Sequence, residues 1–127
     1  MQPPLILIVD DDPGIQDMLS LTLSMSGYDT LSAFNGIEAL GIVTLYKPEC
    51  ILLDVNMPYM DGLQFTQELE LLHLRLCPIV VMTASTDVKK QERIDSINPD
   101  AIVLKPFHLD KLLATLERLI VEAVPKL

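Results

Sequence analysis

The sequence of 127 residues has few basic residues, few cysteines and no long apolar run. Nine Lys and Arg against eighteen Asp and Glu give a net charge of −9, which argues against autonomous nucleic-acid binding because that needs a basic surface. A chain of this length needs no disulfide, so Cys50 and Cys77, each beside apolar residues, are expected to be reduced core thiols. The longest apolar runs, at residues 5–9 and 79–82, are far too short to cross a bilayer.

The rest of the composition is typical of one soluble domain. Half of the residues are hydrophobic, and there is neither a repeat nor a low-complexity stretch. We expect a single domain over residues 1–127, with its core at about 5–122 and a tail or the start of a linker at 123–127. The first four residues lack the basic and long apolar segments of a secretory signal, so a cytoplasmic location is expected. Any partner is expected to be a protein, not nucleic acid or a membrane.

Short apolar segments alternate with longer segments in which apolar residues recur every three or four positions. The first kind predicts buried strands and the second predicts helices. Pro13 is suited to open the first helix, Gly27 to follow it, and Pro48 to follow the second helix. The predicted strands lie at 5–9, 30–33, 50–54, 79–83 and 101–104, and the predicted helices at 14–26, 36–46, 63–74, 87–96 and 109–120.

The helices differ in how clearly they show a core face. Ile37 in the second helix and Leu72 in the third are expected to point inward. The fourth helix, predicted to begin at Asp87, is mostly polar and should be the least secure. Its candidates for a core stripe are Val88, Ile94 and Ile97.

Five strands that alternate with five helices predict a doubly wound α/β fold. Strands that are apolar along their whole length belong to parallel sheets that helices cover on both faces. Right-handed crossovers then place the carboxyl end of every strand at one edge of the sheet. Because open α/β sheets bind ligands outside that edge, polar residues at the strand ends are candidates for one common site.

Polar residues end four of the five predicted strands. Several carboxylates in one pocket repel one another, so a hard cation such as Mg²⁺, which prefers oxygen ligands, is expected among them. One carboxylate, at position 54, is the candidate nucleophile toward a phosphoryl donor, because a divalent ion and a lysine would stabilise charge on the transferred oxygens. The residues are Asp10, Asp11 and Asp12 after the first strand, Asp54 ending the third, Thr83 ending the fourth and Lys105 ending the fifth.

Several nearby polar residues have simpler explanations. Asp12 is expected to cap the first helix, and Asp61 with Gly62 to form the turn that starts the third. His73 and His108 do not fall at strand ends, so surface or helix-cap roles are favoured. A charged patch is expected to be a solvated helix face, with partner binding as the lesser alternative; it consists of Lys89, Lys90, Glu92 and Arg93.

Four motifs, in this order and at these spacings, resemble the receiver domains of bacterial two-component response regulators. They are "ILIVDDDP" at 6–13, "ILLDVNMPYMDG" at 51–62, "VVMTA" at 80–84 and "LKPF" at 104–107. The resemblance covers about residues 5–122. It implies a flavodoxin-like (βα)5 fold with five parallel strands in the order 2-1-3-4-5, and a phosphorylation-dependent switch.

The resemblance also implies roles for the acidic residues. Asp54 would accept a phosphoryl group from a phosphohistidine on a sensor histidine kinase or a phosphotransfer protein. Asp11, Asp54 and the main-chain carbonyl of Asn56 would ligate Mg²⁺, and Asp10 would act mainly through coordinated water. Such a domain is not an enzyme in the usual sense, because it catalyses only its own phosphorylation and dephosphorylation.

Residues of the fourth and fifth strands complete the implied switch. Lys105 would pair with the phosphoryl group, and a cis peptide bond would precede Pro106. Thr83 would donate a hydrogen bond to a phosphoryl oxygen and pull the loop after the fourth strand inward. Many receivers have Tyr or Phe where this sequence has Ile102, so an aromatic readout is not expected here. Small Ala84 leaves the phosphoryl pocket open, which favours fast autodephosphorylation.

Two other functions stay open on the sequence alone. A phosphatase of the haloacid-dehalogenase type also uses an acid pair after its first strand, which would be Asp10 and Asp12, although Pro13 follows that pair here. A receiver-fold interaction module that phosphate does not switch is the other, and Ile102 is compatible with it. The oligomeric state, the downstream target and whether this is a stand-alone receiver or part of a longer regulator are also open.

Overall fold

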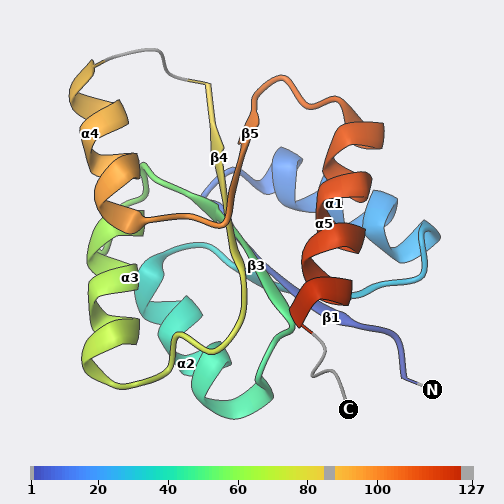
Figure 1. Ribbon diagram of the computed structural model, residues 1–127, viewed down its shortest axis with the longest axis horizontal. Helices are drawn as coiled ribbons and strands as arrows, with labels where there is room; N and C mark the ends of the chain where they lie inside the picture. The colour runs from blue at the N-terminus through green and yellow to red at the C-terminus, as the bar shows by residue number, and fades with distance from the viewer. Residues whose placement is uncertain (1, 85–87, 124–127) are drawn as a thin grey trace.

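The computed structural model describes residues 2–84 and 88–123, and these residues contain one parallel sheet of five strands (Figure 1). The strand order is β2-β1-β3-β4-β5, which is the flavodoxin-like order and confirms the prediction. The strands are β1 (Leu5–Val9), β2 (Asp29–Ala33), β3 (Cys50–Asp54), β4 (Ile79–Thr83) and β5 (Ala101–Leu104).

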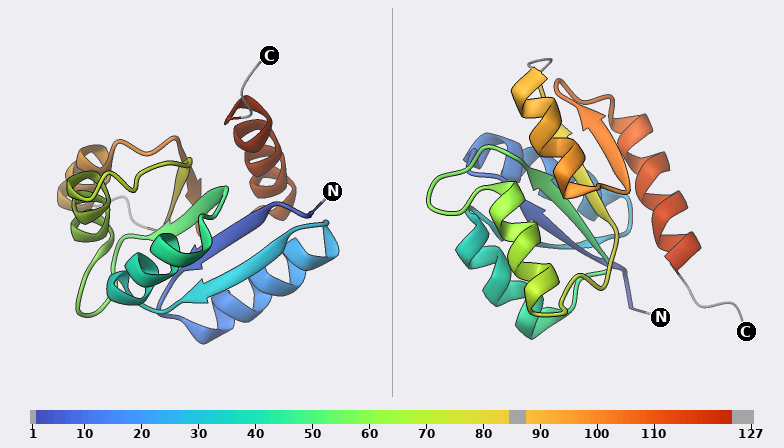
Figure 2. Two further views of the ribbon diagram at one scale, coloured as in Figure 1. Left: turned by 90° about the horizontal axis from the view of Figure 1, so that it is seen from below. Right: turned by 60° about the vertical axis from the view of Figure 1, so that its left-hand side comes forward.

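In the described part of the chain, five helices cover the two faces of the sheet (Figures 1 and 2). Helices α1 and α5 pack on one face, and α2, α3 and α4 pack on the other. None of these helices is long and apolar enough to span a membrane. The helices are α1 (Pro13–Met25), α2 (Gly36–Tyr46), α3 (Gly62–Leu71), α4 (Val88–Ile97) and α5 (Leu109–Ala123).

The alternation of side chains along β1 shows why its sequence is continuously apolar. Leu7 and Val9 belong to the core beneath α2, α3 and α4, whereas Ile6 and Ile8 belong to the core beneath α1 and α5. All four side chains are fully buried. A strand covered on both faces has no solvated side, so an alternating polar pattern is not expected.

Two of the predicted helix starts are capped by aspartate, as expected. The Asp12 carboxylate accepts hydrogen bonds from the backbone N–H groups of Gly14 and Ile15, with Pro13 in the first turn. At α3, the Asp61 carboxylate accepts from the Gln64 N–H while the Gln64 side chain accepts from the Asp61 N–H. Both aspartate side chains therefore cap the first backbone N–H groups of a helix.

Three side chains expected in the core are exposed instead. Helix α3 ends at Leu71, three residues before the predicted end, because the chain turns through a left-handed backbone conformation at His73, and Leu72 is left exposed. Ile37 lies in the first turn of α2, and the buried positions on either side of it are Gly36 and Ala39. Val88 starts α4 and is 72% exposed. The predicted first residue of that helix, Asp87, lies outside the described residues.

The two cysteines are free, as predicted. Cys50 is fully buried in β3, and Cys77 is partly buried before β4. Burial raises the pKa of both thiols, that of Cys77 to about 12, so both are protonated at neutral pH. They are packing residues, since the reactive form of cysteine is the thiolate.

Candidate functional site

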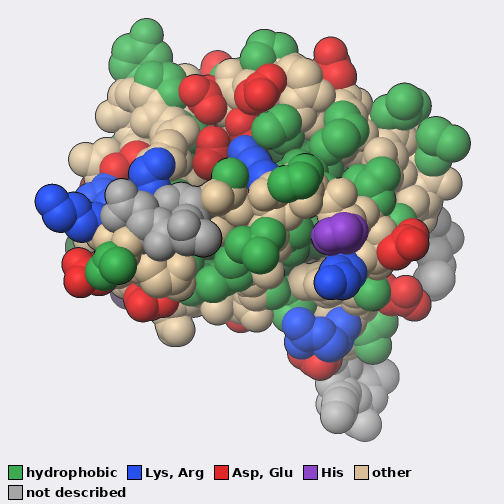
Figure 3. Space-filling view, turned by 90° about the horizontal axis from the view of Figure 1, so that it is seen from above, with side chains coloured by type: hydrophobic (Ala, Val, Ile, Leu, Met, Phe, Trp, Pro, Cys, Tyr) green, Lys and Arg blue, Asp and Glu red, His purple; other side chains and the backbone are tan. Residues whose placement is uncertain are grey.

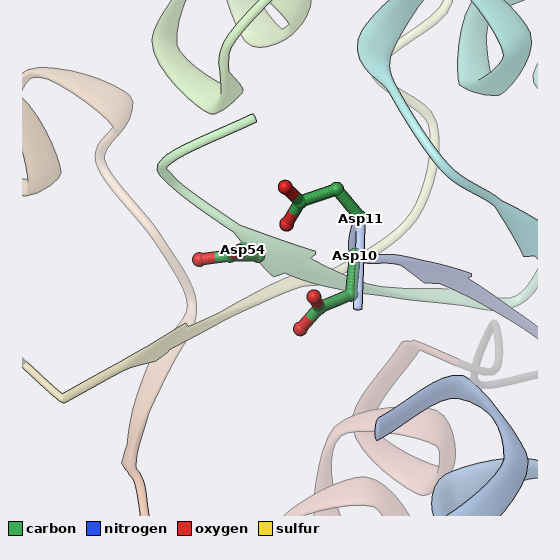
Figure 4. Close-up of side chains that lie close together, drawn as sticks. All are labelled: Asp10, Asp11 and Asp54. Atoms are coloured by element: carbon green, nitrogen blue, oxygen red, sulfur yellow. The ribbon is translucent and has the colours of Figure 1, made fainter. Parts of the chain in front are cut away.

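The strand ends meet at one edge of the sheet, and three carboxylates lie together there. Asp10 and Asp11 follow β1, and Asp54 is the last residue of β3, which is the neighbour of β1. One oxygen from each of the three lies within 4.8 Å of the others, and Figure 4 shows the three side chains extending to the same side from the ends of the two strands. Figure 3 looks onto this edge and shows acidic side chains grouped beside a basic one.

Asp10 is fully buried, and its charge is balanced inside the site. Its Oδ2 accepts a hydrogen bond from the Lys105 Nζ at 2.9 Å. Its Oδ1 accepts from the Asp12 backbone N–H at 2.9 Å, which fixes the start of the loop after β1. A buried carboxylate is tolerated when it is paired in this way.

Gln16 of α1 also fixes this loop, and sequence reasoning missed it. Its side-chain Nε2 lies 2.9 Å from the Ile8 carbonyl, 3.1 Å from the Asp10 carbonyl and 2.9 Å from the Ala33 carbonyl, so it joins the ends of β1 and β2. The side chain is 2% exposed. A polar residue on the buried face of a helix was the available signal, because buried amides need hydrogen-bond partners.

Asp54 is partly buried, with 13% of its side chain exposed. Its Oδ2 lies 4.0 Å from the Lys105 Nζ, and its Oδ1 accepts a hydrogen bond of 3.4 Å from the Asn56 N–H. Burial raises the pKa of Asp54 to about 6; Lys105 opposes this increase, whereas the negative charge of Asp10 adds to it. The carboxylate is therefore mainly ionised at pH 7, which is the form that acts as a nucleophile or a cation ligand.

Gly62 allows the chain to turn closely beneath Asp54. A Cβ at position 62 would lie 3.0 Å from the Asp54 carbonyl oxygen and 3.0 Å from the Val55 Cα. The Gly62 N–H also donates to the Val55 carbonyl at 2.9 Å. A side chain would force α3 away from the end of β3, so this glycine shapes the loop that follows Asp54 and contains Asn56.

A pocket with a volume of about 380 Å³ opens above Asp54. The predicted residues Asn56, Thr83 and Lys105 line it, and Lys105 follows β5 directly rather than ending it. Lys90 of α4 also lines it, although its segment was expected to be a solvated helix face. The full lining is Asp54, Asn56, Thr83, Ala84, Lys90 and Lys105.

The remaining candidates lie elsewhere. His73 and His108 are both exposed, and neither lines the pocket. The His108 carbonyl accepts from the N–H groups of Lys111 and Leu112 at the start of α5, which fits the predicted helix-cap role. The predicted cis peptide bond before Pro106 is present. The loop expected to move after β4 includes residues 85–87, which lie outside the described residues.

The donor set fits a hard divalent cation. Three clustered carboxylates provide oxygen ligands, and Asp11 is exposed to water, which Mg²⁺ retains in its coordination shell. Both oxygens of Asp10 already accept hydrogen bonds, so Asp11 and Asp54 have the greater capacity to ligate. A cation here would also reduce the repulsion among the three charges.

A flavodoxin-like sheet with clustered carboxylates and a lysine at its carboxyl edge defines an α/β protein with a charged site that is suited to a cation. The family comparison specifies it further, since residues 6–117 match the response regulator receiver domain. The chain therefore belongs to the response regulator receiver domain family.

Relatives and solved structures agree with this assignment. Response regulator MprA of Mycobacterium sp. (strain KMS) is 36% identical over 123 residues, covering 97% of this chain and 53% of that protein. MprA of Mycobacterium avium (strain 104) is 36% identical over 121 residues, covering 95% of this chain and 53% of that protein. The chain thus spans about half the length of the curated relatives it matches.

Two solved structures show the likeness in three dimensions. The signal receiver domain of a signal transduction histidine kinase from Syntrophus aciditrophicus has a TM-score of 0.90 and 30% identity, covering 98% of this chain and 95% of that chain. Chemotaxis protein CheY4 of Vibrio cholerae has a TM-score of 0.83 and 32% identity, covering 92% of this chain and 98% of that chain.

Proposed function

We propose that this receiver domain is a phosphorylation-dependent switch in which Asp54 accepts a phosphoryl group from a histidine kinase or a phosphotransfer protein. The observation that carries the proposal is the position of Asp54, whose carboxylate lines an open pocket with Lys105 4.0 Å away. Under this proposal the protein acts in the cytoplasm, and its downstream target is a protein.

Asp54 is the nucleophile of the proposed reaction. One of its oxygens forms a bond to phosphorus while the P–N bond of the phosphohistidine breaks. The bonding electron pair leaves with the ring nitrogen, and the imidazole departs neutral when its other nitrogen carries a proton. The positive charge of Lys105 stabilises the negative charge on the oxygens of the transferred group. The Thr83 hydroxyl donates a hydrogen bond to one of these oxygens after the transfer.

Asp11, Asp54 and the main-chain carbonyl of Asn56 would hold Mg²⁺, with Asp10 acting mainly through water. When bound, Mg²⁺ supplies positive charge that offsets the negative charge of the transferring phosphoryl group. Asp10 orients Lys105 through their 2.9 Å contact. The chain catalyses its own phosphorylation and dephosphorylation and turns over no separate substrate.

The phosphatase alternative is less compatible with the site. It would require Asp10 as the nucleophile, but Asp10 is fully buried, is bonded to Lys105 and does not line the pocket. Its acid partner would be Asp12, whose carboxylate caps α1. No observation among the described residues favours this second function.

Incubation with phosphoramidate and Mg²⁺, followed by intact-mass measurement, tests the proposal. We expect the wild-type chain to gain one phosphoryl group, and Asp54→Asn or chelation of the cation to prevent the gain. Peptide mapping should place the group on Asp54. Failure of the wild-type chain to gain the group, or gain of it by the Asp54→Asn variant at the same rate, would disprove the assignment.

A further inference from the structure

Lys90 places a second positive charge in the pocket above Asp54. The lining of the pocket includes Lys90 on the α4 side and Lys105 on the β5 side. We propose that Lys90 binds the anionic oxygens of the incoming phosphodonor and positions it for attack by Asp54. This inference rests on the proposed function of the domain and assigns a donor-binding residue to the same site.

The helical period of α4 explains why Lys90 faces the pocket. Lys90, Ile94 and Ile97 are spaced at i, i+4 and i+7, which places them on one face of the helix. Ile94 and Ile97 are buried, with exposed fractions of 0% and 1%. The same face continues one turn toward the carboxyl edge of the sheet, where the core ends and the pocket begins. Lys90 therefore lies on the same helix face as the two buried isoleucines, at the position that borders the pocket.

Contacts at two levels of α4 hold this face toward the site. Arg93 forms an ion pair with Asp61, the residue that caps α3 on the loop following Asp54. At the other end, the Arg75 guanidinium donates to the carbonyls of Ile97 at 2.7 Å and Asn98 at 2.6 Å. The direction of Lys90 is thus determined by the packing of α4 and does not depend on the lysine itself.

The charge distribution leaves a role for a second cation. The Lys105 Nζ lies 2.9 Å from an oxygen of Asp10 and 4.0 Å from an oxygen of Asp54, so two carboxylates already share its charge. Among the described residues, Lys90 forms no ion pair. A donor whose phosphoryl group is dianionic meets repulsion as it approaches three carboxylates, and an ammonium on the open side of the pocket reduces it.

In the proposed contact, Lys90 forms and breaks no covalent bond. With phosphoramidate as the donor, an Asp54 oxygen bonds to phosphorus as the P–N bond breaks. The nitrogen, already protonated in the zwitterionic donor, leaves with the bonding pair as ammonia. Lys90 contacts the phosphoryl oxygens throughout and donates no proton to the leaving group.

Phosphorylation kinetics of matched variants test the role of Lys90. Lys90→Met is compared with Lys89→Met, which removes the same charge from the neighbouring position that does not line the pocket. We expect the half-saturating phosphoramidate concentration to rise about 3- to 10-fold in Lys90→Met, as for a partly exposed charge pair, with a maximal rate within about twofold of wild type. Lys90→Arg should restore the wild-type value, and Lys89→Met should leave it unchanged.

The outcomes separate this inference from the function on which it rests. If the wild-type chain is modified on Asp54 and Lys90→Met has the same half-saturation as Lys89→Met, the role of Lys90 is overturned while the phosphoacceptor role stands. If the wild-type chain gains no phosphoryl group, both are overturned. Lys90 is exposed, so folding of the variants is expected to be preserved, and a circular-dichroism melt verifies it.

Discussion

At the scale of single residues, the site combines an ion pair that stabilises the fold with a carboxylate, Asp54, whose ionised form destabilises it. The fully buried Asp10 and the partly buried Lys105 form a close pair, whereas Asp54 lies 4.0 Å from the same lysine and beside two further carboxylates. The raised pKa of Asp54 expresses this difference, because burial and like charges disfavour its ionised form. A carboxylate whose ionised form is disfavoured by its surroundings is suited to bind a cation or a phosphoryl group.

Asp54→Asn is expected to stabilise the cation-free protein, and the gain should depend on pH. The pKa of Asp54 is about 6 in the folded protein against 3.8 ordinarily, so between these values the folded state binds the proton more tightly. Its contribution to the free energy of unfolding therefore falls as pH rises through this window. Because the group is partly exposed to solvent, which screens its charge, we expect a gain of about 1 kcal/mol at pH 7 in Asp54→Asn.

Urea unfolding in a chelator at pH 4, 5, 6 and 7 measures this difference. The stability advantage of Asp54→Asn should be small at pH 4 and should level off above pH 6. Addition of Mg²⁺ should reverse it if the wild-type site binds the cation as proposed, because binding to the folded state alone stabilises it. An advantage that is equal at every pH would contradict the assigned pKa.

Lys105→Met should have the opposite effect. Removal of the ammonium leaves the fully buried Asp10 carboxylate without its 2.9 Å partner. We expect the free energy of unfolding to fall by about 2 to 3 kcal/mol, since breaking a buried ion pair leaves an uncompensated charge. Urea unfolding gives the value, and Lys111→Met, at an exposed lysine, is the control. Equal stability of the two variants would show that the pair does not stabilise the fold.

At the scale of elements, the sequence predicted the strands better than the helix ends. The sequences of β3 and β4 are apolar up to one polar residue at the end, which makes them easy to recognise, and both strands have their predicted bounds. The end of α3 was wrong because the apolar pattern continues into Leu72, beyond the point where the backbone leaves the helix. In α4, too few apolar residues were available to define a face. Val88 was therefore expected in the core stripe, but it is exposed, and Lys90 lines the pocket instead.

Arg93→Met is expected to loosen α4. The ion pair between Arg93 and Asp61 joins this polar helix to the loop that follows Asp54, and both side chains are partly exposed. We expect a fall of about 0.5 to 1 kcal/mol in the free energy of unfolding, and faster amide hydrogen exchange confined to α4. The control is Arg118→Met, which breaks a more exposed pair with Glu122 in α5. Exchange in α4 that matches the control would contradict the role of the pair.

At the scale of the whole molecule, the topology made most of the site predictable. A parallel sheet brings Asp10, Asp54, Thr83 and Lys105 to one edge whatever their separation in sequence, so strand ends were sufficient to find them. Helix residues that reach the same edge were not predictable in this way. Gln16 and Lys90 depend on how each helix rotates on the sheet, which the packing of the neighbouring elements decides.

The central claim is that the pocket above Asp54 is a Mg²⁺-dependent phosphoryl switch. Amide chemical shifts recorded with beryllofluoride, a phosphoryl mimic, test it most directly. We predict shifts at Asp54, Thr83 and Lys105 and along α4 that require Mg²⁺ and are lost in Asp54→Asn. Shifts limited to the surroundings of Asp54 would indicate a module that binds phosphate without switching, and no Mg²⁺-dependent shift at Asp54 would contradict the account.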